Sequence, residues 1–230
     1  QLPFDHLRTV ANTYGYVDAL LVSPSGDVLL ATTARPELGT NLRKGKYRDT
    51  ELTRVLDVAR TTMRPVSSLF RIHPPTGRAA VWVVAPILQG RTLVGYVAVE
   101  IGSKAITSLT HDYAGLGATG DIVLFEVRAG RLMLLTPTRD NKLPTFQPVP
   151  WNGAKDSPMA LAAEGRSGFG QTKNLHGVPS IAWWTYLPQL KCGLVVRMDS
   201  SEALGALAVR RKLALWTALV SVLIALVAAW

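Results

Sequence analysis

Short apolar runs alternate with polar turns along the chain, and their spacing predicts strands and helices in turn. Val17–Val22 and Val28–Thr32 are rich in β-forming residues and flank the turn SPSGD, so they predict a hairpin. Asp49–Thr62 spaces its apolar residues at helical intervals, with Asp49 or Thr50 as the N-cap. The first part of the chain therefore predicts a hairpin followed by a helix.

Three β-rich runs follow, and the second half of the chain repeats the whole pattern. The first three runs are Val66–Ile72, Ala79–Leu88 and Leu93–Ile101. After a helical link at Lys104–Tyr113, GDIVLFEVRAGRLMLLTP again predicts strand, turn and strand, and Asp156–Glu164 predicts a short helix. GRSGFG is then expected to be a loop before the last three strands, Gln171–Leu175, Val178–Tyr186 and Cys192–Met198. An offset of roughly 100 residues, the size of a small domain, predicts two similar modules in tandem.

The C-terminal end combines a predicted helix with a long uncharged run. Ser200–Lys212 is helix-like and continues without a proline into Leu213–Trp230, which carries no charge. Crossing a bilayer takes about 20 apolar residues, so this run predicts a transmembrane helix, with a buried core helix as the alternative. Basic residues 210–212 would place the preceding domain in the cytoplasm if they alone decided the orientation.

Composition narrows the function classes. The 230 residues hold 25 Lys and Arg against 16 Asp and Glu, a formal net charge of +9. Because the cations are scattered and no aromatics interleave with them, nucleic-acid binding is not expected. The single cysteine, Cys192, excludes a disulfide or a cysteine-rich metal site within one chain.

The sequence offers no catalytic constellation. Its histidines stand alone, without the spacing of a metal site, and no Gly-x-Ser-x-Gly motif occurs. GLGATGD has the glycine spacing of a dinucleotide fingerprint, but it precedes a strand instead of following one. We therefore expect a turn there. No catalytic residue, metal site or cofactor is expected, and the segment is not predicted to be an enzyme.

Binding remains, and four residues are the candidates. Arg71 and Trp82 lie on neighbouring predicted strands, where an arginine could pair with a ligand carboxylate. Tyr47 precedes the first helix and Tyr96 lies on a later strand. For each the alternative is an exposed arginine or a core aromatic residue. The expected ligand is a small molecule, with carboxylates and amino-acid-like compounds among the candidates.

The order of these motifs resembles that of the double Cache domain, a tandem PAS-like sensor. The resemblance covers Tyr16–Lys212 and rests on DALLVSPSGDVLLAT, LGTNL, APILQGRTLVGYVAVEI, GLGATGDIVLFEVRAGRLMLLTPTR and GVPSIAWWTYLPQLKCGLVVRMDSSEA. It implies an α+β fold of two PAS-like modules, each an antiparallel sheet with flanking helices. The expected boundaries are 1–15 for the end of an N-terminal helix, 16–103 for the membrane-distal module, 104–199 for the membrane-proximal module, 200–212 for a juxtamembrane helix and 213–230 for the start of a transmembrane helix.

The same resemblance implies a function. Such domains lie outside the cytoplasm in bacterial sensor histidine kinases, diguanylate cyclases and chemoreceptors, as homodimers anchored in the bilayer, here through 213–230. Their ligand usually lies in the membrane-distal module. Amino-acid-binding members carry an arginine followed two residues later by Trp-Tyr, whereas this chain has RPVSSLF in that region, so that ligand class does not carry over. The alternative is an ectodomain that binds no small molecule and serves dimerisation or a protein partner.

Overall fold

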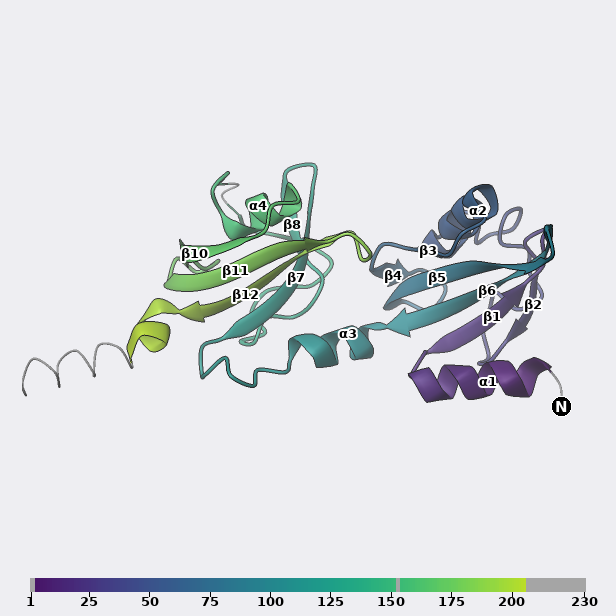
Figure 1. Cartoon of the computed structure of the whole chain (residues 1–230), viewed down its shortest axis with the longest axis horizontal. Coiled ribbons are helices and arrows are strands. Elements are labelled where there is room, and N and C mark those ends of the chain that lie inside the picture. The colour runs from purple at the N-terminus through teal and green to yellow at the C-terminus, as the bar shows by residue number, and fades with distance from the viewer. Residues whose placement is uncertain (1–2, 152–153, 206–230) are drawn as a thin grey trace, which may run out of the picture.

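Two antiparallel six-stranded sheets lie side by side along the long axis of the molecule, with helix α3 (Ser103–Thr110) between them (Figure 1). The computed structural model describes residues 3–151 and 154–205. The predicted α+β class with two tandem antiparallel sheets is confirmed. Within these ranges no helix has the length and apolar character needed to cross a membrane. The predicted membrane helix at 213–230 lies outside them, as does most of the predicted juxtamembrane helix.

The N-terminal sheet has the strand order β2-β1-β6-β5-β3, and β4 also pairs with β5. Its strands are β1 (Asp18–Val22), β2 (Val28–Ala31), β3 (Val66–Ser67), β4 (Arg71–His73), β5 (Arg78–Gln89) and β6 (Thr92–Gly102). Helix α2 (Glu51–Thr62) covers one face, and α1 (Pro3–Tyr14) lies on the other side of the sheet (Figure 1). The hydroxyl of Thr50 accepts the N–H of Thr53, which confirms the N-cap prediction.

One predicted strand in this sheet is wrong. The run 66–72 forms two short strands, because the Ser68 hydroxyl accepts the backbone N–H of Trp82 at 2.8 Å. A side chain thus takes a bond that the strand ladder would otherwise use, and pairing resumes only at β4. A hydroxyl that competes for backbone groups is the usual reason why serine interrupts regular structure.

The C-terminal sheet has the order β10-β11-β12-β7-β8-β9. Its strands are β7 (Asp121–Arg128), β8 (Arg131–Leu134), β9 (Pro148–Val149), β10 (Gly168–Lys173), β11 (Pro179–Leu187) and β12 (Cys192–Asp199). Helix α4 (Pro158–Ala163) covers one face, and its N-cap Ser157 accepts the N–H of Ala160. The strand predicted at 171–175 begins three residues earlier and ends at Lys173, so β10 includes part of the expected loop GRSGFG. A Cβ on Gly168 would meet the Trp184 ring at 2.8 Å, so only glycine lets β10 pass this indole.

The two sheets share one connectivity, which supports the duplication read from the sequence. The path β8-β7-β12-β11-β10 repeats the path β2-β1-β6-β5-β3. Asp18 and Asp121 are the first residues of the corresponding strands β1 and β7. Across the ladder, Asp18 lies opposite Glu100 and Asp121 opposite Arg197. These pairs therefore mark equivalent points in the two sheets.

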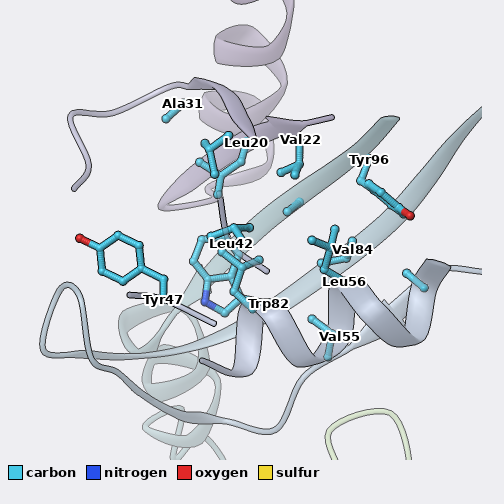
Figure 2. Close-up of a cluster of buried hydrophobic side chains, with 14 residues drawn as sticks. Leu20, Val22, Ala31, Leu42, Tyr47, Val55, Leu56, Trp82, Val84 and Tyr96 are labelled. Atoms are coloured by element: carbon cyan, nitrogen blue, oxygen red, sulfur yellow. The ribbon is translucent and has the colours of Figure 1, made fainter. Parts of the chain in front are cut away.

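Each sheet buries an apolar cluster beneath its helix. Figure 2 shows the cluster between α2 and the N-terminal sheet, which includes Leu20, Leu42, Leu56, Trp82 and Tyr96. The C-terminal cluster has fewer large side chains from its central strands. It comprises Val123, Phe125, Leu132, Leu134, Val149, Met159, Ala162, Ala182 and Val195.

A third cluster joins the sheets to each other. Phe70 and Val81 of the N-terminal part pack with Leu124 and Cys192 of the C-terminal sheet. The Ser67 hydroxyl also donates to a backbone carbonyl beyond β11, that of residue 189, at 2.5 Å. Burial, reinforced by a nearby carboxylate, raises the pKa of the Cys192 thiol to about 12. The cysteine is therefore an uncharged core residue of the contact between the sheets.

A buried charge cluster fixes the segment between β2 and α2 over the N-terminal sheet. The guanidinium of Arg35 contacts Asp18 at 3.1 Å, Glu37 at 3.2 Å and Glu100 at 2.6 Å. His73 Nε2 lies 2.6 Å from the Glu37 carboxylate. All five side chains are at most 2% exposed. Segments that lie far apart in the sequence thus meet at a single guanidinium.

Hydrogen bonds complete this cluster. The Asp18 carboxylate accepts the backbone N–H and hydroxyl groups of both Thr32 and Thr33. Although burial lowers the pKa of Arg35, the charges of Glu100 and Glu37 outweigh it and raise that pKa above its ordinary value. For the Glu37 carboxyl, burial acts in the opposite direction and raises the pKa. The His73 hydrogen bond and the Arg35 charge outweigh burial and bring the pKa of Glu37 below its usual value. Both groups are therefore held in their charged forms.

Replacing Arg35 should destabilise the protein strongly. Arg35→Ala leaves three buried carboxylates without their cation, a change that typically costs about 3–5 kcal/mol. Arg43→Ala is the matched control, because Arg43 pairs with Asp57 near the surface at 32% exposure and should lose at most about 1 kcal/mol. Urea denaturation followed by circular dichroism measures both. Equal losses in the two variants would contradict a structural role for the cluster.

Acid should weaken this cluster through Glu37. Its folded pKa lies below the usual 4.5, so its contribution is complete above that pH and is lost as the pH falls through the folded pKa. We expect the free energy of unfolding to fall between about pH 6 and about pH 3, and to fall less steeply in Glu37→Gln. Denaturation curves over this range provide the measurement. Parallel slopes for the two proteins would show that Glu37 does not carry the effect.

Cys192 should report on the contact between the sheets. As a buried thiol with a raised pKa, it should react slowly with a thiol reagent in the folded protein and fast in urea. Phe70→Ala removes its neighbour from the cluster and should accelerate the reaction under native conditions. Val58→Ala is the control, because Val58 lies on α2 and is 37% exposed. Equal rates for all three folded proteins would contradict this packing.

Candidate ligand-binding site

Three of the four predicted site residues lie in the core beneath α2. Trp82 and Tyr96 are each 1% exposed and Tyr47 is 8% exposed. The Tyr47 hydroxyl donates to the carbonyl of Pro36 at 3.2 Å, and the Tyr96 hydroxyl points away from Trp82 (Figure 2). Burial raises the pKa of Tyr96. The structure therefore places these aromatic residues within the packed face of the sheet.

Arg71 lies elsewhere, at the contact between the sheets. Its guanidinium forms an ion pair with Glu126 of β7 and donates to the carbonyl of Phe70 at 3.0 Å. The cation that stacks on Trp82 is instead Arg35, whose guanidinium carbon lies 4.7 Å from the indole centre. The structure does not bring Arg71 and Trp82 together in one site, and a ligand contact by any of the four residues stays a prediction.

Protein groups occupy the face of Trp82. The Arg35 guanidinium lies over the indole, and the centre of the His73 ring lies 5.2 Å from the indole centre. Three carboxylates already engage that guanidinium. A ligand carboxylate at Arg35 would have to displace one of them. This part of the N-terminal sheet is built as a closed core in the structure.

The C-terminal sheet holds an open pocket of about 580 Å³ on the face covered by α4. Ligand pockets for small molecules typically span about 300–1,000 Å³. Apolar walls come from Met159, Ala182 and Val195, all of them buried. The charged residues among those that line it are Arg197, Lys173 and Asp156. The cavity thus combines an apolar floor with a small excess of positive charge.

Arg197 is the buried charged group of this pocket. One terminal nitrogen contacts Asp121 at 3.0 Å, and the side chain is 11% exposed. The other terminal nitrogen, Nη1, is buried and has no hydrogen-bond partner in the part of the chain that the structure describes. Other buried donors also lack a partner among the described residues, for example Trp82 Nε1 in the core of the N-terminal sheet. Arg197 differs from Trp82 because it lines an open cavity, where an acceptor from outside the chain could reach the guanidinium.

Sequence reasoning missed this pocket, although the repeat contained a signal for it. Aligned without a gap from Val81 and Ile181, the duplicated stretches place Trp82 opposite Ala182. The ladders agree, since Trp82 pairs with Glu100 and Ala182 pairs with Arg197. A methyl group stands where the other sheet carries an indole. The same framework is therefore filled in one sheet and left open in the other.

A second cavity, of about 470 Å³, lies beside α1, the end of β6 and the start of α3. Its buried charged wall residue is Glu100, whose carboxylate is already bound to Arg35. Within the described ranges no group of three or more histidine, cysteine, aspartate or glutamate residues could hold a metal ion. The pocket of the C-terminal sheet is therefore the stronger candidate for a small-molecule site.

Comparison with solved structures identifies the fold. The extracellular domain of rpHK1S-Z16, assigned as a histidine kinase, superposes with a TM-score of 0.58 at 16% identity, covering 87% of this chain and 78% of that one. The corresponding domain of mmHK1S-Z3, also assigned as a histidine kinase, gives 0.59 at 12% identity, with 88% and 80% covered. The ligand-binding domain of the Pseudomonas fluorescens chemoreceptor CtaA, solved with L-serine, gives 0.53 at 14%, with 86% and 78% covered.

No family model matches the chain, and no curated protein matches it by sequence. At 12–16% identity these likenesses speak for the fold, and they extend over most of both chains. Each of the three is an extracellular or ligand-binding domain and none is a catalytic one. The chain therefore has the double Cache fold, as the order of its motifs predicted.

Proposed function

We propose that this chain is the extracytoplasmic, small-molecule-sensing part of a bacterial transmembrane receptor. The observation that carries the proposal is the open pocket on β12, the strand that continues directly into the helical residues 200–205. A ligand on this strand would lie next to the chain's route toward the uncharged run 213–230. The shared fold of histidine kinase and chemoreceptor ectodomains supports the same function.

Residues 200–205, which we call the exit helix, leave the C-terminal sheet after β12. Contacts at the start of this helix could transmit whether a ligand is bound. The Glu202 carboxylate accepts the backbone N–H groups of Ala118 at 2.6 Å and Thr119 at 2.8 Å, and also the Thr119 hydroxyl. These bonds, that of the Thr119 hydroxyl first, hold the pKa of Glu202 below its usual value. The loop GLGATGD, a turn as predicted, thus binds the helix that leaves the sheet.

The same loop is tied to the pocket. Arg139 donates its guanidinium N–H to the carbonyls of Gly117 and Gly120 at 2.8 and 3.0 Å. Its backbone N–H donates to Asp121, the residue that pairs with Arg197 in the pocket. A change in the Arg197 contact would therefore reach the Glu202 loop through neighbouring bonds.

The rest of the proposal concerns the intact receptor. Residues 213–230 would anchor it in the inner membrane, with the two sheets on the periplasmic side despite the basic residues 210–212. The output module would be a histidine kinase, or a diguanylate cyclase as the second choice. The likeness to histidine kinase ectodomains favours the first of these. Alkaline phosphatase fused before residue 210 should be active if the two sheets lie in the periplasm. An inactive fusion would place them in the cytoplasm instead.

A second candidate function, a dimerisation or protein-interaction ectodomain, is favoured by one surface feature. Phe169 of β10 and Trp183 of β11 lie opposite each other in the ladder and are 80% and 45% exposed. Two adjacent exposed aromatic residues are typical of contact surfaces. The same pair is where a homodimer of the sensor would form.

Ligand binding should change how strongly the backbone amides of the exit helix are protected, and hydrogen exchange measures this protection. We expect a compound that raises the melting temperature of the full chain in detergent to change amide exchange at residues 199–205. Glu202→Gln should keep the thermal shift but reduce the change in exchange, because it weakens the bonds to Ala118 and Thr119. Glu164→Gln is the control, since Glu164 is exposed and lies outside these contacts.

The outcomes separate the two candidate functions. If a broad panel of metabolites leaves the melting temperature unchanged while Phe169→Ser lowers the association constant of a dimer, the interaction ectodomain is favoured over the sensor. If a compound binds but exchange at 199–205 stays the same in the wild type, the chain binds ligand without the proposed transmission.

A further inference from the structure

The pocket of the C-terminal sheet has a chemistry of its own, which follows from how its central arginine is paired. In the N-terminal sheet Arg35 has three carboxylate partners, and in the C-terminal sheet Arg197 has one. A guanidinium carries five N–H donors in a planar fork that suits the two oxygens of a carboxylate. Arg197 Nη1 is buried without an acceptor among the described residues, so part of this fork is unpaired.

The space beside Arg197 has an apolar floor, and Ser157, Thr172 and Asn174 add polar groups to its lining. Ala182, directly opposite Arg197 in the ladder, leaves the floor open, and Val195 and Met159 form the neighbouring walls. A molecule that binds here must therefore combine one anionic group with an apolar body. Asp156 lines the same pocket and would repel a second negative charge.

We propose that this pocket binds a small monocarboxylate, with the carboxylate on Arg197 and the aliphatic part over Ala182, Val195 and Met159. The inference rests on the proposed sensing function and gives that function a ligand class and a site in the C-terminal sheet. A phosphate or dicarboxylate fits less well, because Asp156 opposes its additional charge and burying that charge against the apolar floor costs free energy. Lys173 at the rim attracts anions toward the opening.

A bound ligand would share the Arg197 guanidinium with Asp121. The Arg197 fork contacts Asp121 through Nη2, and a carboxylate at Nη1 would share the same cation. No bond of the protein has to break, since the two nitrogens face different acceptors. The ligand replaces the missing acceptor of a buried donor, an arrangement in which hydrogen bonds to charged groups contribute most.

Calorimetric titration of the full chain in detergent tests the proposal. The probes are acetate, butyrate, hexanoate, succinate, inorganic phosphate and butylamine. We expect butyrate or hexanoate to bind best, because both the carboxylate and the apolar walls are engaged. Acetate should bind more weakly, and succinate, phosphate and butylamine weakly or not at all.

Two variants locate the site by independent means. Arg197→Gln should weaken monocarboxylate binding by roughly 10- to 100-fold, the loss expected for a charged hydrogen bond of about 1.5–3 kcal/mol. Ala182→Trp restores the indole of the other sheet, keeps Arg197 and should abolish binding by filling the cavity. Arg166→Gln is the control, because Arg166 is 68% exposed and outside the pocket, and its affinity should match the wild type. Circular dichroism shows whether each variant is folded.

The results distinguish this inference from the sensing function itself. Monocarboxylate binding that survives both Arg197→Gln and Ala182→Trp would overturn the site but leave a ligand-binding domain. Tighter binding of phosphate, succinate or butylamine than of butyrate would overturn the ligand class. The absence of monocarboxylate binding at millimolar concentration would also overturn the class, and another compound from the wider thermal screen would then carry the sensing function.

Discussion

A buried cation is the interaction on which the N-terminal sheet depends. Arg35 could not remain inside without its carboxylates, because an unpaired charge in a protein interior costs several kcal/mol. Asp18 at the start of β1, Glu100 near the end of β6 and Glu37 between β2 and α2 meet this requirement together. In doing so they draw the connection between β2 and α2 across the sheet and set the guanidinium over Trp82. The closed face of this sheet is thus a consequence of charge pairing as much as of apolar packing.

The C-terminal sheet has the same strand connectivity and also holds a largely buried arginine, but Arg197 has one carboxylate partner where Arg35 has three. Its arginine comes from the ladder itself, at the position equivalent to Glu100, so no long connection has to reach inward. Arg139, which follows β8 much as Arg35 follows β2, binds backbone carbonyls of the 117–120 loop instead. One carboxylate and a methyl group at Ala182 replace three carboxylates and an indole. What remains is a cavity beside a donor that has no partner among the described residues, and the proposed binding site rests on these two features.

The alternation of apolar runs was enough to predict most strands, α2 with its cap, and the duplication. It failed where a side chain replaces a backbone bond, at Ser68, and where a glycine admits a large neighbour, at Gly168. The site was harder to predict for a physical reason. A buried aromatic residue and a ligand-stacking one have the same pattern in sequence, and the partner of Arg71 lies in the other sheet. The charge cluster was equally hidden, since Arg35 and Glu100 are 65 positions apart.

The position of Asp121 explains why a ligand in the C-terminal pocket would be felt at the exit helix. This residue shares Arg197 with the pocket and accepts the N–H of Arg139, whose guanidinium holds the loop that binds Glu202. A ligand shifts such an arrangement only as far as it binds one state better than the other. A difference of 1.4 kcal/mol, well within one charged hydrogen bond, already changes the ratio of two states about tenfold. A single carboxylate on Arg197 is therefore sufficient to bias the helix, provided that Asp121 occupies different positions in the two states.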